Sequence, residues 1–380
     1  MIQRKRDLEH LLELIDLFPV TAVLGSRQSG KTTLVNQIKS DHYFDLENPR
    51  DLARLDNPQL TLENLTGLIV IDEIQRKPDL FPLLRFLVDK NSSQRYLILG
   101  SASKDLLKHS SESLAGRIGY YHLAGFSMED VGSENWRLLM LRGGYPLSFL
   151  AQENKHSFLW LEQYITTFLE KDIPQLGIMI PSYTLRRFWM MISHYHGQLV
   201  NFSEMGRSFG ISDVTVRKYI DILEGTFMVR QLMPWHNNTS KRLIKSPKLY
   251  LSDSGIFHAL QSIESESDLW VHPKLGASWE GFALEQTIRA IGKDSNEVFF
   301  WGTHGGAELD LFWKDSGKSF GAEFKFMDAP VMTRSMSTAI SDLELEHLYV
   351  IYPGNQNYQL DEKVSVIPLD SVWSRLAPKV

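Results

Sequence analysis

Short apolar runs alternate with amphipathic stretches through the first third of the chain. A helical repeat of apolar residues comes first, with Leu8, Leu11 and Ile15 on one side. The apolar runs that follow cover residues 20–24, 43–46, 68–71, 96–99 and 119–123. Strands that alternate with helices form a parallel sheet with helices on both faces. The pattern therefore predicts an α/β domain over residues 1–128.

The middle of the chain, residues 129–265, is predicted to be a helical domain that ends in a winged helix-turn-helix. Residues 203–209 and 213–223 have helical spacing and are joined by a short turn, in which Ser212 suits the cap of the second helix. Two extended segments, 227–235 and 247–251, are predicted to form the wing.

The last part of the chain, residues 266–380, reads as an α+β domain. A helix is expected over 277–291 and another over 333–342. The predicted strands cover residues 297–301, 308–313, 319–326 and 347–352. The order of these elements is one helix, three strands, one helix and one strand.

The composition is typical of a cytoplasmic globular protein. A length of 380 residues with 43% hydrophobic and 23% charged residues suggests two or three domains. Cysteine is absent, which excludes disulfides, thiolate metal sites and cysteine nucleophiles. No apolar run approaches the ~18 residues of a membrane span, so no membrane partner is expected. The net charge of −6 means that any nucleic-acid contact must come from a local basic patch.

The strongest chemical signal is a phosphate-binding loop directly after the first predicted strand. The sequence Gly-Ser-Arg-Gln-Ser-Gly-Lys-Thr-Thr at residues 25–33 matches G-x-x-x-x-G-K-[ST] without a mismatch. Such a loop wraps phosphates with backbone N–H groups, and the following helix adds favourable electrostatics. Lys31 is expected to reach the β- and γ-phosphates, and the Thr32 hydroxyl to bind Mg²⁺. The predicted nucleotide-binding residues are Gly25, Ser26, Arg27, Gln28, Ser29, Gly30, Lys31, Thr32 and Thr33.

Two acids end the strand at residues 68–71, as in a Walker B motif. Asp72 is predicted to hold Mg²⁺, and Glu73 to polarise the attacking water. Ser101 ends the next strand and suits sensing of the γ-phosphate, although turn chemistry is an alternative. Arg117 is a candidate arginine finger or γ-phosphate sensor, with a structural salt bridge as the alternative.

These motifs resemble those of prokaryotic AAA-superfamily P-loop ATPases. The shared segments are the loop at 25–33, Asp-Glu-Ile-Gln at 72–75 and Leu-Ala-Gly-Arg at 114–117. The resemblance extends over nearly the whole chain and implies an ATPase fold with ATP and Mg²⁺ as ligands. In that family a carboxy-terminal region of unknown function follows the ATPase domain, so the resemblance supplies no physiological role.

The predicted wing is basic, because no acidic residue occurs between Gly225 and Ser252. DNA binding would place the second helix in the major groove and lysines on phosphates. Asp213 and Asp221 on that helix favour the alternative, a winged helix used for packing or for sensing the nucleotide state. The predicted nucleic-acid contacts are Arg217, Lys218, Lys241, Arg242, Lys245 and Lys248.

Charged residues interrupt the apolar strands of the last domain. Asp310 and the pair Glu323 and Lys325 lie on neighbouring predicted strands and can face one site. With the element order given above, they resemble the PD-(D/E)xK nuclease superfamily. The resemblance implies that Asp310, Glu323 and the helical Glu285 bind Mg²⁺ and that Lys325 activates water. Salt bridges among these side chains are the alternative.

We therefore predict an ATP-binding and ATP-hydrolysing protein whose nucleotide state controls a winged-helix and nuclease-like region. This region is expected to act on nucleic acid or to be controlled by it. The alternative is a regulatory or signalling ATPase switch, in which an inactive nuclease-like domain binds protein. A protein partner or a second copy of the chain is also expected.

Overall fold

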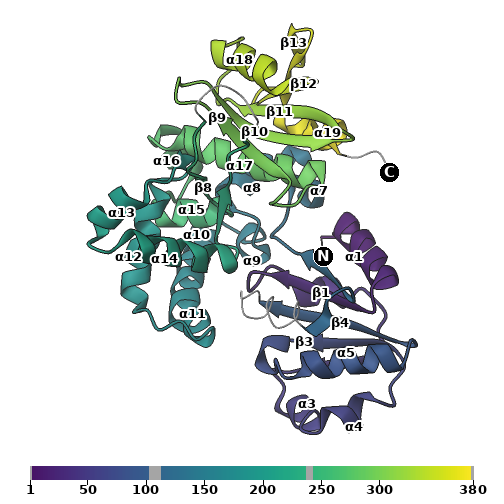
Figure 1. The fold of residues 1–380 in the computed structure, drawn as a ribbon. Helices are drawn as coiled ribbons and strands as arrows, with labels where there is room; N and C mark the ends of the chain where they lie inside the picture. The colour runs from purple at the N-terminus through teal and green to yellow at the C-terminus, as the bar shows by residue number, and fades with distance from the viewer. Residues whose placement is uncertain (1, 102–112, 237–242, 378–380) are drawn as a thin grey trace. The chain divides into compact units, whose positions relative to one another are not determined.

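The computed structural model describes residues 2–101, 113–236 and 243–377, which fold into two compact units (Figure 1). The first unit is Met1–Gly125 together with Gly225–Phe227. The second unit is Phe126–Glu224 together with Met228–Val380. The second unit thus contains most of residues 129–265 and 266–380, which the sequence predicts to be separate domains.

A parallel sheet with strand order β2-β3-β4-β1-β5 forms the first unit. Its strands are β1 (Val20–Gly25), β2 (His42–Asp45), β3 (Gly67–Asp72), β4 (Gln94–Ser101) and β5 (Ile118–His122). Each expected strand is present, and the predicted parallel α/β architecture is confirmed. Because β4 lies between β1 and β3, the ends of β1 and β3 flank the end of β4.

Helices cover both faces of this sheet (Figure 1). They are α1 (Lys5–Leu17), α2 (Lys31–Val35), α3 (Pro49–Arg54), α4 (Pro58–Leu62) and α5 (Leu80–Lys90). Ala22 and Leu24 of β1 pack in the cluster that contains α5, whereas Val23 packs with Leu11 of α1. Burial on both faces explains why these strands read as continuous apolar runs.

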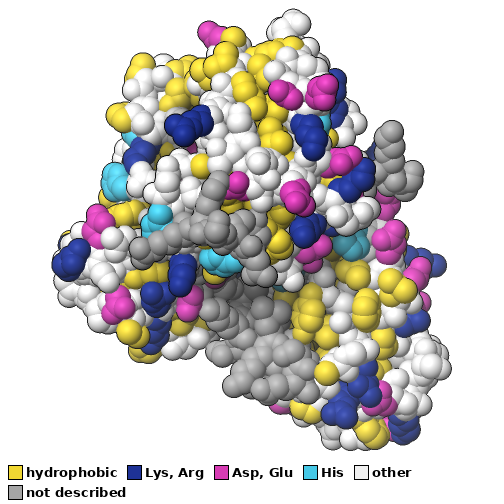
Figure 2. Space-filling model, turned by 45° about the horizontal axis from the view of Figure 1, so that its top comes forward, with side chains coloured by type: hydrophobic (Ala, Val, Ile, Leu, Met, Phe, Trp, Pro, Cys, Tyr) yellow, Lys and Arg dark blue, Asp and Glu magenta, His cyan; other side chains and the backbone are white. Residues whose placement is uncertain are grey.

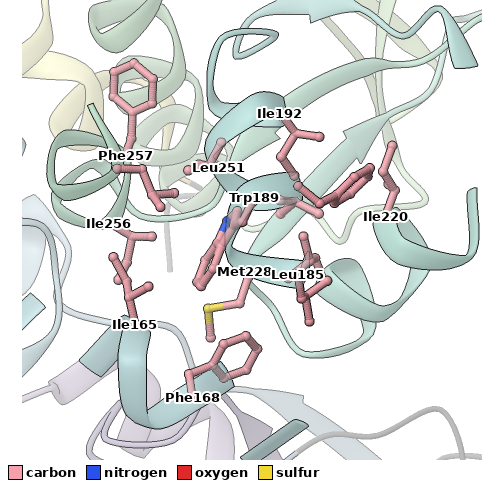
Figure 3. Packing of buried hydrophobic residues seen from close by; sticks show 14 of the residues in the cluster. Ile165, Phe168, Leu185, Trp189, Ile192, Ile220, Met228, Leu251, Ile256 and Phe257 are labelled. Carbon is pink, nitrogen blue, oxygen red and sulfur yellow. The ribbon is translucent and has the colours of Figure 1, made fainter. Parts of the chain in front are cut away.

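The second unit begins with helices and a small antiparallel sheet. The helices are α7 (Met128–Val131), α8 (Trp136–Arg142), α9 (Pro146–Phe149), α10 (Asn154–Thr167), α11 (Ile173–Gln175), α12 (Ser182–Ser193), α13 (Phe202–Phe209), α14 (Asp213–Gly225) and α15 (Ser254–Leu260). The sheet has the order β6-β8-β7, from β6 (Gln198–Leu199), β7 (Val229–Leu232) and β8 (Lys248–Leu251). One apolar core joins α10 to α15 with β7 and β8, and it contains Trp189 of α12, Ile220 of α14 and Leu251 of β8 (Figure 3).

The rest of the second unit is a mixed six-stranded sheet with order β13-β14-β12-β11-β10-β9. Its strands are β9 (Val298–Gly302), β10 (Glu308–Asp315), β11 (Lys318–Phe324), β12 (His347–Tyr352), β13 (Tyr358–Asp361) and β14 (Val364–Pro368). The accompanying helices are α16 (Glu266–Val271), α17 (Leu275–Ile291), α18 (Arg334–Leu343) and α19 (Val372–Leu376). The chain follows the expected order of α17, three antiparallel strands, α18 and β12, which pairs parallel to β11.

Candidate nucleotide site and carboxylate cluster

The phosphate-binding loop connects β1 to α2 in the first unit. Gln28 and Gly30 take positive φ angles of 63° and 95°, which turn the backbone tightly before the helix begins at Lys31. A Cβ atom on Gly25 would lie 2.2 Å from the carbonyl oxygen of Leu123. Glycine at position 25 is therefore required by the close approach of β5's end, and the predicted loop lies in its expected strand–loop–helix context.

Hydrogen bonds from two side chains, Lys31 and Arg4, hold this loop in place. The Lys31 ammonium donates to the carbonyl oxygens of Gly25 and Ser26, at 3.0 and 2.9 Å. Arg4 is buried and donates to the carbonyl oxygens of Ser29 and Ala124, at 3.3 and 2.9 Å. Sequence reasoning missed Arg4, because nothing in the run Arg-Lys-Arg distinguishes it from its neighbours.

Asp72 lies at the end of β3, beside the start of α2. Its Oδ2 atom accepts hydrogen bonds from the Thr32 hydroxyl at 2.9 Å and from the Tyr43 hydroxyl at 2.8 Å. Burial, followed by the charge of Asp72, raises the pKa of Tyr43, which keeps this hydroxyl a donor. A hydroxyl and a carboxylate are the hard oxygen ligands that Mg²⁺ prefers. Thr32 and Asp72 therefore fit a magnesium ion next to the phosphate loop.

Glu73 follows Asp72 with a left-handed backbone, at φ 57°. The Gln75 side-chain amide donates to its carboxylate. Burial raises the pKa of Glu73, and the Gln75 hydrogen bond and the charge of Lys31 oppose that rise only in part. A carboxylate with a raised pKa is a stronger base at neutral pH, which suits a group that accepts a proton from water.

Ser101 and Arg117 lie at opposite ends of the sheet. Ser101 pairs in register with Gly25, so its backbone is at the edge where the phosphate loop begins; its side chain is outside the described residues. The carbonyl oxygen of Arg117 accepts from the Val20 N–H at 3.1 Å, at the start of β1. The Arg117 guanidinium binds the Asp89 carboxylate with two hydrogen bonds, at 2.6 and 3.0 Å. Arg117 is thus about 16 Å along β1 from its own loop and cannot sense the γ-phosphate there.

In the second unit, three predicted residues meet at β10 and β11. The Lys325 ammonium is 2.6 Å from Glu323 Oε2 and 3.8 Å from Asp310 Oδ2. The Phe324 N–H donates to Asp310 Oδ2 at 3.1 Å. The carboxylates of Asp310 and Glu323 are both buried. Each lies on an inner strand of the sheet, where side chains on both faces are covered.

The fourth predicted residue, Glu285, is not part of this cluster. Arg230 of β7 binds it with two hydrogen bonds, at 2.5 and 3.0 Å. The helical acid that does reach the cluster is Glu280, which lies five residues earlier on α17. Five residues correspond to a rotation of about 140° around a helix, so the two acids face different neighbours. The structure therefore does not bring Glu285 together with the other predicted metal ligands.

The sequence predicts Lys248 as a nucleic-acid contact, but the structure places it in this cluster. Its side chain is only 4% exposed. Its ammonium lies 3.2 Å from Asp310 Oδ1 and 3.3 Å from Glu280 Oε1, and it also contacts Glu308. Tyr250, on the same face of β8, donates to Glu280 at 2.6 Å. A lysine so enclosed cannot contact nucleic-acid phosphates.

Three of the other predicted nucleic-acid contacts are exposed. Arg217 and Lys218 lie on the outer side of α14, where the Arg217 guanidinium is 3.7 Å from the centre of the Phe202 ring. Lys245 is exposed before β8, and Lys241 and Arg242 lie outside the described residues. On the face shown in Figure 2, the described basic side chains are interspersed with acidic ones.

The Arg230–Glu285 pair gives a stability prediction. Replacing Arg230 with alanine leaves a largely buried carboxylate unpaired, so we expect the second unit to lose about 3 kcal/mol of unfolding free energy. The double variant Arg230→Ala/Glu285→Ala should lose less unfolding free energy than the two single variants, Arg230→Ala and Glu285→Ala, lose together. All nine tryptophans lie in the second unit, so their fluorescence during urea unfolding reports on this unit alone. Unchanged stability in Arg230→Ala would contradict the prediction.

Comparison with known families defines the class of the first unit. Residues 17–132 match a family described as an AAA domain. Residues 133–267 and 275–372 match two families described as domains of unknown function. Together with the sheet order and the phosphate loop, the first match identifies an AAA-type P-loop ATPase domain, which confirms the prediction for this part of the chain.

The whole chain has relatives in mycobacteria. It is 46% identical over 376 residues to the uncharacterized proteins Rv2008c of Mycobacterium tuberculosis and Mb2031c of Mycobacterium bovis. The match covers 98% of this chain and 85% of each relative. The chain therefore belongs to the family of these proteins.

Solved structures give weaker likenesses. The Walker-type ATPase PABY2304 of Pyrococcus abyssi is 15% identical, with a TM-score of 0.48, over 69% of this chain and 96% of that one. The Holliday junction branch migration motor RuvB of Thermotoga maritima is 15% identical, with a TM-score of 0.29, over 60% and 90%. Both TM-scores are below 0.5, so the fold rests on the sheet order and the AAA match. Across the described residues, none of the helices has the length and apolar character that a membrane crossing needs.

Proposed function

We propose that this protein hydrolyses ATP with Mg²⁺ and that its nucleotide state controls the second unit, which acts on nucleic acid or is controlled by it. The observation that carries the ATPase proposal is the hydrogen bond of 2.9 Å between Thr32 and Asp72, directly beside Lys31. This hydrogen bond joins the phosphate loop to the end of β3. These two segments are distant in the sequence and together would form a Mg²⁺–nucleotide site. The absence of cysteine supports a cytoplasmic location.

Each side chain has a distinct task in this proposal. Thr32 and Asp72 would hold Mg²⁺, which neutralises charge that develops on the phosphoryl oxygens. Lys31 exchanges its hydrogen bonds with the loop carbonyls for bonds to the β- and γ-phosphates. Glu73 turns from Gln75 and accepts a proton from the attacking water, and the products are ADP and inorganic phosphate.

Arg117 is proposed to act on a second copy of the chain. Its position at the far end of β1 removes it from its own phosphate loop, while its guanidinium is on the surface of the first unit. A guanidinium supplied by a neighbouring subunit would stabilise charge on the transferred phosphoryl group. The same position supports a homo-oligomer as the active form.

The order of elements around the small sheet supports a winged helix. α12, β6, α13, α14, β7 and β8 follow one another, and β8 pairs between β6 and β7. We propose that α14 presents Arg217 and Lys218 to DNA and that Lys245, with Lys241 and Arg242, contacts phosphates. We also propose nucleic acid as a partner of the last sheet, whose element order resembles that of nucleases.

A second candidate function is a regulatory switch in which the nuclease-like region binds a partner without cleaving anything. The specific observation in its favour is Lys248, which occupies the carboxylate cluster where cleavage would need metal. DNA binding distinguishes the two candidates.

The triple variant Arg217→Ala/Lys218→Ala/Lys245→Ala is expected to bind duplex DNA more weakly than wild type. Each lost phosphate contact should reduce the slope of log K against log salt by about one, because fewer counterions are released. The measurement is fluorescence anisotropy over a salt series, in ADP and in ATP. Replacing the exposed Lys155, Lys171 and Arg334 together is the charge-matched control and should leave the slope closer to that of wild type.

Two outcomes would count against DNA binding through α14 and the wing. Equal slopes for wild type and the triple variant would move the contact elsewhere. No binding by wild type, in either nucleotide, would favour the regulatory switch.

The same measurement tests control by the nucleotide state. Equal affinity of wild type for DNA in ADP and in ATP would contradict that control.

A further inference from the structure

Strand β8 inserts two polar side chains among the acids of the last sheet. Lys248 and Tyr250 are two residues apart, so they lie on the same face of the strand. Both reach Glu280 of α17, and Lys248 also reaches Asp310 of β10. The small sheet of the second unit thus supplies part of a cluster whose acids come from the six-stranded sheet and its helix.

The Lys248 ammonium has a full set of partners. An ammonium carries three N–H donors, and here three carboxylates surround it: Glu280, Glu308 and Asp310. Its side chain is 4% exposed, and an ammonium buried to this degree is stable only when it is paired. Its position in the cluster is therefore specified by charge and by hydrogen bonding.

Two ammonium groups offset part of the negative charge of the cluster without a metal. Four carboxylates, Glu280, Glu308, Asp310 and Glu323, face the ammonium groups of Lys248 and Lys325. Burial on its own raises the pKa of Asp310, but the two ammonium groups outweigh it and hold that pKa below its ordinary value. Burial raises the pKa of Glu280 to about 7 and that of Glu323 to about 8.

A divalent ion does not fit this arrangement. A metal shared by Asp310 and Glu280 would need oxygen atoms of both at about 2.0–2.6 Å. The Lys248 nitrogen lies between the same carboxylates, at 3.2 and 3.3 Å, and so occupies the position that a metal shared by them would need. Within the described ranges, no group of three or more acidic or histidine side chains is arranged to hold a metal.

We infer that Lys248 is the resident cation of this cluster and takes the place of the divalent metal that the nuclease resemblance implies. The cluster is therefore an internal ion-pair junction between β8, α17 and β10, and it does not support metal-dependent cleavage. This inference is independent of ATP hydrolysis, so either can fail without the other.

Manganese binding tests it in the full-length protein without nucleotide. Free Mn²⁺ is measured by electron paramagnetic resonance during titration of wild type, Lys248→Ala, Lys248→Ala/Asp310→Ala and the surface control Lys245→Ala. We expect Lys248→Ala to bind one more Mn²⁺ per chain than wild type. The added site should vanish in Lys248→Ala/Asp310→Ala, and Lys245→Ala should match wild type.

Wild type gives a second test that requires no substitution at Lys248. Its Mn²⁺ stoichiometry should equal that of Asp310→Ala, and Ca²⁺ or Mn²⁺ should leave its tryptophan-monitored unfolding temperature unchanged, since an unbound metal does not stabilise the native state. A site in wild type that disappears in Asp310→Ala would overturn the inference. So would a folded Lys248→Ala variant that gains no site, because another feature would then exclude the metal.

Discussion

Replacing Glu73 with glutamine is expected to reduce kcat for ATP by about 10²- to 10⁴-fold, the usual contribution of a positioned general base. Glutamine has the size of glutamate but cannot accept a proton from water. The left-handed backbone at Glu73 and its side-chain contact with Gln75 set the resting position of this group, and glutamine fits both. ATP affinity should therefore change little. Phosphate release measures kcat, and equilibrium binding of a fluorescent ATP analogue measures affinity.

The control for this change is Glu13→Gln, which removes an exposed carboxylate on α1 of the same unit. It should hydrolyse ATP at the wild-type rate. If Glu73→Gln also does so, the assignment of Glu73 as the proton acceptor is wrong, whatever the status of the phosphate loop.

Replacing Lys31 with alanine is expected to weaken ATP binding by about 100-fold or more, since charge-assisted hydrogen bonds contribute about 1.5–3 kcal/mol each. Two carbonyl oxygens hold the Lys31 ammonium at the loop, where the phosphates of ATP are proposed to bind. Lys39→Ala, an exposed lysine after α2, is the matched control and should bind as wild type does. Isothermal titration calorimetry with ATP and Mg²⁺ measures the affinity of wild type and of both variants. Equal affinity of Lys31→Ala, Lys39→Ala and wild type would contradict a role for the loop.

The first unit could be predicted closely because its signals are local. A strand buried on both faces is an apolar run, and the phosphate loop is a contiguous motif between that strand and a helix. The acids at the end of β3 could be predicted for the same reason, since parallel strands end at one edge of the sheet. Arg4 could not be predicted, because its hydrogen bond to the carbonyl oxygen of Ala124 joins residues 120 positions apart. No local sequence pattern indicates such a contact.

The carboxylate cluster could be predicted only in part. Asp310, Glu323 and Lys325 interrupt apolar strands, so the alternation of the sequence indicates their common site. The choice between Glu280 and Glu285 had no such signal, because α17 is buried around most of its circumference and its apolar residues do not define one inner face. Lys248 lies in a basic stretch, and its burial depends on acids that are 32 to 62 residues away.

Phosphate release from ATP by the purified full-length chain tests the central claim most directly. Wild type, Lys31→Ala and Glu73→Gln are compared with Mg²⁺ and with the metal chelated. We expect release by wild type that requires Mg²⁺, loss of binding and of release in Lys31→Ala, and binding without turnover in Glu73→Gln. Release that is the same in all three proteins, or that persists without Mg²⁺, would contradict an ATPase site built from Lys31, Thr32, Asp72 and Glu73.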